Sequence, residues 1–244
     1  TLIENPHPNI MKFFYADSID TKNHFIISEF IEGSVLKRDY LVKYLLKLKQ
    51  GGTKYILKIF EQLLLGLNHL HNNNICHRDI KNENIMVDFN HIYFDDGDLS
   101  SEKVNIIKFI DFGLSCALDN SSCYDNEKKI SMIGTNLYMA PEIVPNSKTN
   151  LPIEFVKKTD VFGLGISMFE LLHNFTFYDK LEYLDAHPVK AIKIKPTIQS
   201  VKSKFYHFFS QHEDIKLLDF IINMMIEIDP TMRLSTKDLL SIIQ

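Results

Sequence analysis

The segment Cys76–Met86, with the sequence C-H-R-D-I-K-N-E-N-I-M, constrains this 244-residue chain more than any other. It is a short polar stretch between a long apolar run with helical periodicity, Tyr55–Asn72, and a β-branched run. An acid, a base and an amide follow one another closely in it, at Asp79, Lys81 and Asn84. The pattern predicts a loop that joins a core helix to a strand and carries the side chains of a site.

Two further motifs follow in the chain. They are Asp111-Phe112-Gly113 and Ala140-Pro141-Glu142, and Gly134-Thr135 stands just before the second. Phosphoryl transfer needs a group that orients the attacking hydroxyl, a cation on the moving phosphate, and oxygen ligands for magnesium. The loop and the D-F-G triplet supply these groups. One H-R-D triplet is a weak signal, but three motifs in this order indicate phosphoryl transfer.

In this order the motifs resemble those of a eukaryotic protein kinase, and the resemblance covers nearly the whole chain. It implies an α+β, two-lobed protein kinase-like fold. Residues 1–33 would form the end of the small lobe, with its last two strands and the hinge, and residues 34–244 the complete, mainly helical large lobe. The implied activity is transfer of the γ-phosphate of ATP to Ser and Thr hydroxyls of protein substrates, with ATP and Mg²⁺ as cofactors.

The resemblance assigns a role to each residue of the loop. Asp79 would accept or orient the proton of the substrate hydroxyl, because a carboxylate can do so while it stays ionised near neutral pH. Lys81 would neutralise the transferring phosphoryl group, and it favours Ser/Thr over Tyr substrates. Asn84 and Asp111 would hold magnesium as hard oxygen ligands.

A second implied set binds ATP. The Glu29 carbonyl and the Ile31 amide would bond the adenine edge, with Ser28 as a small gatekeeper; the alternative is that this segment is an ordinary strand end. The full cofactor-binding set is Ser28, Glu29, Ile31, Met86 and Ile110, with Met86 as the floor of the adenine pocket.

Regulation is implied at three positions. In related kinases the Arg before the catalytic Asp, here Arg78, receives a phosphate from the activation segment. Ser131, three residues before the Gly-Thr pair, resembles the primary phosphorylation site, and a phosphate there would add about −1.5 to −2 charge that can dock on Arg78. Thr135 is expected to bond near Asp79 and Lys81. The phosphate would come from an upstream activating kinase or from autophosphorylation.

Structural roles follow from the same resemblance. His77 is expected to be a core residue rather than an acid or base, packed under the D-F-G Phe. The implied structural set is Leu2, Phe13, His77 and Phe112 in a hydrophobic spine, Glu142 paired with Arg233 of the D-P-x-x-R turn, and Asp160 near the start of a large helix. The D-F-G-L-S and H-R-D-I-K-x-E-N forms look most like the calcium/calmodulin-dependent group, although Asn82 replaces the usual Pro.

Periodicity and turn residues predict the secondary structure. The expected strands are Ile10–Tyr15 with His24–Ile31 as a hairpin, Ile85–Phe89 and Val104–Ile110. The expected helices are Val35–Lys49, Tyr55–Asn72, Lys157–His173, Ile215–Ile228 and Ser235–Ile243, the last with Ser235 as N-cap. The acidic stretch Asn90–Lys103 lacks the ligand spacing of an EF-hand, so a solvated hairpin tip is expected there. Leu184–Ser210 gives no clear pattern.

Composition excludes some partners. A net charge of −4 and a pI near 6.2 give no electrostatic case for nucleic acid or an anionic membrane. The sequence holds no apolar run of the roughly 18 residues that a bilayer span needs. Three cysteines are too few for a disulfide framework and fit a reducing compartment, either cytoplasm or nucleus.

One part of the kinase pattern has no counterpart. No G-x-G-x-x-G phosphate loop occurs, and the glycines before Gly66 are Gly33, Gly51 and Gly52. We therefore expect an N-terminally incomplete domain whose phosphate loop, Lys and helix Glu lie upstream of Thr1, and which is weak or inactive alone. Two rival hypotheses remain open: a pseudokinase or scaffold that acts by partner binding, and a small-molecule phosphotransferase of kinase-like fold.

Overall fold

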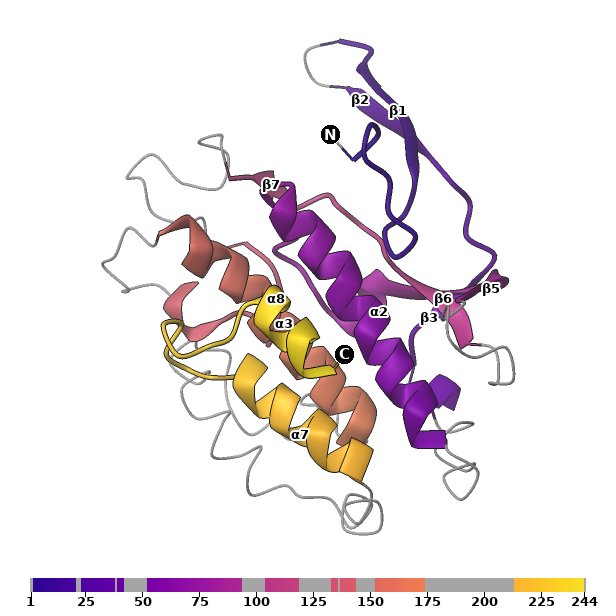
Figure 1. Cartoon of the computed structure of the whole chain (residues 1–244). Helices are drawn as coiled ribbons and strands as arrows, with labels where there is room; N and C mark the ends of the chain where they lie inside the picture. The colour runs from indigo at the N-terminus through magenta and orange to yellow at the C-terminus, as the bar shows by residue number, and fades with distance from the viewer. Residues whose placement is uncertain are drawn as a thin grey trace.

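The computed structural model describes residues 2–20, 23–37, 39–41, 52–93, 104–118, 133–135, 137–143, 152–173 and 213–243. The expected hairpin is present near the N-terminal end of the chain. Strand β1 (Phe13–Ser18) pairs antiparallel with β2 (His24–Ser28), and Asn23 donates its backbone N–H to Asp20 Oδ1 at 2.9 Å in the turn between them. Figure 1 shows this hairpin standing apart from the helical body.

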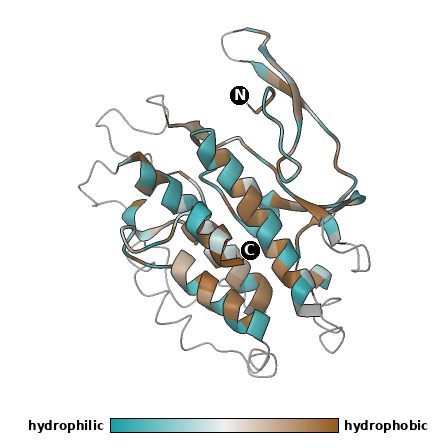
Figure 2. Ribbon diagram, viewed as in Figure 1, coloured by the Kyte–Doolittle hydropathy of each residue, from teal (hydrophilic) through white to brown (hydrophobic). Residues whose placement is uncertain are grey.

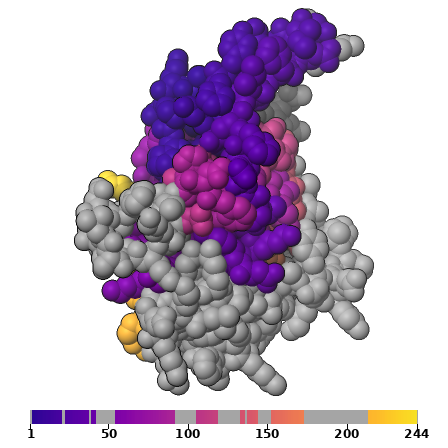
Figure 3. Space-filling model, turned by 90° about the vertical axis from the view of Figure 1, so that its right-hand side faces the viewer, coloured from indigo at the N-terminus to yellow at the C-terminus, as the bar shows by residue number. Residues whose placement is uncertain are grey.

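A three-stranded antiparallel sheet lies below the hairpin. Its order is β3 (Gly33–Val35), β5 (Ile85–Tyr93) and β6 (Val104–Phe109). An isolated bridge from Ile10 to Phe109 attaches the N-terminal segment to this sheet. Gly33 is required in β3, since a Cβ there would lie 1.8 Å from the Val87 carbonyl oxygen. The space-filling view in Figure 3 shows the indigo N-terminal segment projecting above the magenta part of the chain.

Two short elements position the central loop. Strand β4 (Ile75–Cys76) ends just before His77 and pairs with β7 (Cys116–Ala117), which follows the D-F-G triplet. The 3₁₀ turn η2 (Asn82–Asn84) ends with Asn84 of the central loop, and the 3₁₀ turn η4 (Pro141–Ile143) contains the Pro and Glu of the A-P-E motif. The β4–β7 pair thus holds the two motif-bearing segments side by side.

The helical body consists of α2 (Gly52–Asn72), α3 (Ile153–His173), α7 (Glu213–Met225) and α8 (Thr236–Ile243), and α2 packs on the sheet through β6. Figure 2 shows alternating brown and teal along α2, as expected of a helix that buries one face. Helix α3 is apolar around most of its circumference, and nearly all its residues after Lys158 are buried. It is therefore the central helix of the core. Gly165 lets α7 approach α3, since a Cβ there would lie 2.8 Å from Met225 Cβ.

Several boundaries differ from the sequence-based expectation. Strand β5 continues to Tyr93 through a register shift between Asp88 and Ile92, and α3 begins four residues earlier than expected. Most of the helix expected over 35–49, most of the acidic stretch 90–103, and the unassigned segment 184–210 lie outside the described residues. Ser235 caps α8 as expected, in a reciprocal box with Asp238. Among the described residues, no helix is long and apolar enough to cross a membrane.

Candidate active site

Asp79 is the centre of a polar network in the loop after β4. Its Oδ1 accepts hydrogen bonds from the Thr135 backbone N–H (2.9 Å) and hydroxyl (2.7 Å), and its Oδ2 lies 2.8 Å from Lys81 Nζ and 3.0 Å from Asn84 Nδ2. Lys81 Nζ also donates to Thr135 Oγ1 at 2.8 Å. Burial alone would raise the pKa of Asp79, but the bonds from Lys81 and Thr135 outweigh it and hold this pKa below its ordinary value.

Asp160, buried in the first half of α3, anchors the backbone of this loop. Its carboxylate accepts the backbone N–H groups of His77 and Arg78, each at 2.8 Å, and lies 3.2 Å from His71 Nε2. Arg78 has a φ of 64°, a left-handed conformation that is costly for a non-glycine residue. The buried carboxylate compensates for this strain. Burial would raise the pKa of Asp160, but its hydrogen bond with His71 and the nearby histidines lower it.

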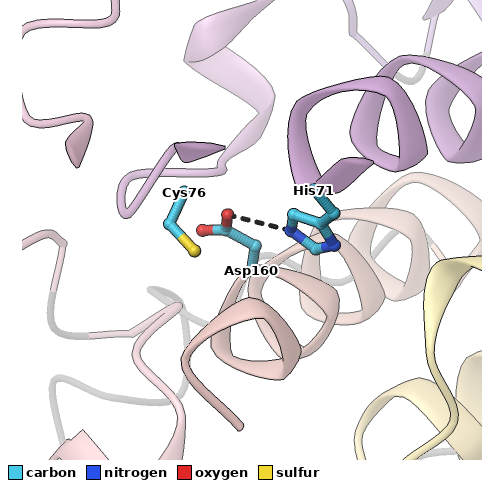
Figure 4. Close-up of side chains that lie close together, drawn as sticks. All are labelled: His71, Cys76 and Asp160. Carbon is cyan, nitrogen blue, oxygen red and sulfur yellow. Dashed lines mark hydrogen bonds and ion pairs between the residues drawn. The ribbon is translucent and has the colours of Figure 1, made fainter. Parts of the chain in front are cut away.

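Cys76 completes a cluster with His71 and Asp160, whose ligand-type atoms all lie within 4.8 Å of one another (Figure 4). Through Asp160, this cluster is a hydrogen-bonded anchor for the backbone of the loop. The carboxylate is already occupied by N–H donors, and burial followed by the charge of Asp160 raises the pKa of the Cys76 thiol well above its ordinary value. Sequence reasoning missed this supporting role of His71 and Cys76.

The D-F-G triplet lies against the loop. Phe112 contacts Phe13 edge-on with ring centroids 5.4 Å apart, and the His77 ring centroid lies 4.8 Å from that of Phe112. His77 is fully buried, and its Nε2 lies 3.0 Å from the Ile110 carbonyl oxygen. Leu2 packs against the same hydrophobic core. The Phe112 ring thus contacts both Phe13 and His77, and the role of these residues as a spine stays a prediction.

Asn84 and Asp111 are the candidate metal ligands. The Asn84 amide nitrogen donates to the Asp79 carbonyl and carboxylate, which leaves its side-chain oxygen available to a cation. The Ile110 backbone N–H donates to the Asn84 carbonyl at 2.9 Å, so the strand end that carries Asp111 is tied to the loop. Asp111 is exposed and adopts a φ of 59°. Asn84 is buried whereas Asp111 is exposed, and both offer the hard oxygen donors that magnesium prefers.

The predicted nucleotide-binding residues lie on neighbouring elements. Ser28 ends β2, and Glu29 and Ile31 lie on the connection to β3. Met86 lies on β5 opposite Lys108 of β6, and Ile110 directly follows β6. The sheet therefore brings the connection, Met86 and Ile110 to one region of the molecule.

Arg78 has an unused donor. Its Nε donates to the Leu114 carbonyl at 2.6 Å, while its Nη1 is buried and has no partner in the described part of the chain. Burial lowers the pKa of this guanidinium. Ser131, the residue expected to carry a phosphate toward Arg78, lies outside the described residues.

Glu142 and Arg233 form a buried ion pair between the A-P-E turn and the turn before α8. The guanidinium binds the carboxylate in a bidentate arrangement at 2.6 and 3.0 Å, and it lies 5.0 Å from the Phe162 ring.

Among the cysteines, Cys76 keeps a free thiol whereas Cys116 is disulfide-bonded. The cysteines therefore do not establish a reducing compartment.

Comparison with known proteins finds that the protein kinase domain family matches residues 2–242. A mimivirus protein described as a serine/threonine-protein kinase, R436, from Acanthamoeba polyphaga mimivirus, is 31% identical over 83% of this chain and 75% of that protein. The serine/threonine-protein kinases ste20 of Emericella nidulans and shk2 of Schizosaccharomyces pombe are 30% and 27% identical over 97% and 98% of the chain. The chain spans only 23% and 34% of these two proteins.

Proposed function

The chain belongs to the protein kinase family and is a kinase domain of the serine/threonine type, and we propose that its Asp79 loop transfers the γ-phosphate of ATP to Ser and Thr hydroxyls of protein substrates. The observation that carries this proposal is the single network in which Lys81, Asn84 and Thr135 hold the Asp79 carboxylate. Family membership without such a network would leave the chemistry unassigned.

The loop residues account for the transfer step. The low pKa of Asp79 keeps it ionised at neutral pH, so it can accept a hydrogen bond from a Ser or Thr hydroxyl and orient its oxygen. That oxygen forms a bond to the γ-phosphorus as the bond to the ADP oxygen breaks, and the hydroxyl proton passes toward Asp79. Lys81, held beside Asp79, neutralises charge on the phosphoryl oxygens.

The cofactor assignments remain part of the proposal. Asn84 and Asp111 would hold magnesium, which neutralises phosphate charge when bound. The donor set fits, because both residues offer hard oxygens and Asp111 is exposed. Ser28, Glu29, Ile31, Met86 and Ile110 would bind the adenine, and their common location around the β2–β3 connection supports this.

Regulation by phosphate docking on Arg78 also remains proposed. The buried and unpaired Nη1 of Arg78 supports it, since a phosphate would satisfy that donor and would order the segment that carries it. Mass spectrometry of active protein tests this at Ser131. An unmodified Ser131 together with a fully active S131A variant would contradict the regulatory role.

The finer assignments are proposals too. Residues 1–33 as the end of a small lobe and 34–244 as the large lobe are supported by the separation of the β1–β2 hairpin from the helical body (Figure 1). Similarity to the calcium/calmodulin-dependent group stays a prediction, and the relatives named above include Ste20-type kinases instead. A cytoplasmic or nuclear compartment, an upstream kinase, and the absence of nucleic-acid or membrane partners likewise stay predictions.

The test is phosphate transfer from Mg-ATP to a Ser/Thr peptide by the protein expressed from its whole reading frame. D79N is expected to slow transfer about 10²–10⁴-fold and D111N to slow it as well, and K216M on the exposed face of α7 serves as the control. A pseudokinase is the second candidate, since this sequence holds no G-x-G-x-x-G loop. No transfer by the parent and no thermal shift with Mg-ATP would favour that candidate.

A further inference from the structure

Lys108 and Glu29 form a partly buried ion pair behind the connection between β2 and β3. Lys108 Nζ contacts both Glu29 carboxylate oxygens, at 2.7 and 2.9 Å, and the two side chains are only 9% and 17% exposed. The backbone N–H of Lys12 also donates to Glu29 Oε1 at 2.7 Å. This pair is thus better shielded from solvent than an ordinary surface salt bridge.

The first half of the connection is held at Glu29, whose backbone N–H donates to the Lys12 carbonyl at 2.9 Å. Phe30 is 91% exposed, so its side chain provides no packing. The second half is fixed separately, because the Phe89 backbone N–H donates to the Glu32 carbonyl at 3.0 Å and Asn90 Nδ2 donates to Glu32 Oε2. The Glu29 side chain is therefore one of three restraints on the peptide after Ser28, together with the Glu29 backbone N–H and the buried Ile31 side chain.

Lys108 comes from the strand that also leads into the candidate metal site. It lies on β6 opposite Met86 and three residues before Asp111. A second carboxylate, Asp88 Oδ2, lies 3.8 Å from the same ammonium, and its side chain is 3% exposed. Lys108 therefore separates two shielded carboxylates, and its removal would leave them to repel each other and push Glu29 outward.

We propose that Lys108 is a positioning residue for nucleotide, which acts through Glu29 to fix the backbone groups of the β2–β3 connection against the adenine. The proposal rests on the proposed function, because it takes this connection as the adenine site. Lys108 would act through Glu29 rather than as a direct ligand of adenine or phosphate. Sequence reasoning did not single out Lys108.

The test measures binding and kinetics of K108M, which keeps the length of the side chain and removes its charge. We expect the KM for ATP and the Kd for adenosine to rise about tenfold or more, the size of one lost charge-assisted contact, with kcat and the KM for peptide little changed. Binding of tripolyphosphate, which has no adenine, should not change. The control is K216M, which breaks the exposed Lys216–Glu213 pair of 2.6 Å on α7.

Two further variants separate positioning from structural damage. K108R keeps the charge and should bind adenosine like the parent. E29Q added to K108M removes the repulsion with Asp88, so it should move the adenosine affinity back toward the parent value. If K108M binds adenosine as tightly as the parent, the positioning role of Lys108 is wrong while the proposed function stands. The same holds if K108M loses affinity equally for adenosine and for tripolyphosphate. A parent protein that binds no nucleotide overturns the proposed function as well.

Discussion

Replacing Glu142 by Ala should be far more costly than its position in a surface turn suggests. The Arg233 side chain has no exposed surface, and that of Glu142 is 7% exposed. In the E142A variant the guanidinium keeps its bonds to the Glu227 and Lys158 carbonyls, at 2.9 and 2.8 Å, but loses its counter-charge. A buried charge left without its partner costs about 3–5 kcal/mol.

This cost is large against the total stability of a domain, which is about 5–15 kcal/mol. The matched control is E213A, which removes the partner of Lys216 from a pair with the same 2.6 Å separation but side chains 52% and 84% exposed. Exposed pairs contribute about 0–1 kcal/mol. Because both pairs have the same N···O distance, the difference in cost between the two variants reports the effect of burial on the ion pair.

The assay is urea unfolding followed by far-ultraviolet circular dichroism, since the chain has no tryptophan. We expect E142A to lower the free energy of unfolding by about 3–5 kcal/mol and E213A by less than about 1 kcal/mol. The E142A effect should persist in high salt, because salt screens buried pairs weakly. An E142A cost no larger than that of E213A would show that burial adds nothing to the Glu142–Arg233 pair.

Three further variants test the anchor, the helix packing and the pH dependence. D160N should lower the free energy of unfolding by about 3 kcal/mol, because two backbone N–H donors lose their charged acceptor, and urea unfolding measures this cost. The same variant should lower kcat, which steady-state kinetics measures. G165A should cost about 1–3 kcal/mol in urea unfolding, because its Cβ would overlap Met225. Burial and the neighbouring His69 lower the pKa of His7 to about 4 from its ordinary 6.5. The unfolded chain therefore binds more protons between these values, so stability falls as pH falls from 6.5 toward 4, and melting temperatures of H7Q should depend less on pH over that range.

The motifs made much of the site predictable, because each residue of the loop lies within a few positions of the others. Asp79, Lys81 and Asn84 needed only the local turn to meet, and Thr135 was expected beside them from its motif. The ends of the elements were less predictable. Helix α3 begins at Ile153, directly after Pro152, but its mostly apolar sequence gave no periodic signal for that start.

The supporting contacts could not be predicted, because they depend on tertiary structure. His71 and Cys76 occupy positions that read as ordinary core residues, and only the packing of α3 brings Asp160 to them. The pair of Lys108 with Glu29 joins residues far apart in the sequence, and it depends on how β6 lies behind the β2–β3 connection. Sequence patterns predict faces and periods, whereas these contacts arise from how separate elements pack.

The most direct test of the central claim is the rate of phosphate transfer from Mg-ATP to a peptide whose only acceptor is Ser, compared between the parent protein and D79N at saturating nucleotide. We expect D79N to keep its affinity for Mg-ATP and to transfer phosphate about 10²–10⁴-fold more slowly, because the hydroxyl loses the group that orients it and accepts its proton. A D79N protein that binds nucleotide and transfers phosphate at the parent rate would show that Asp79 is not the catalytic carboxylate.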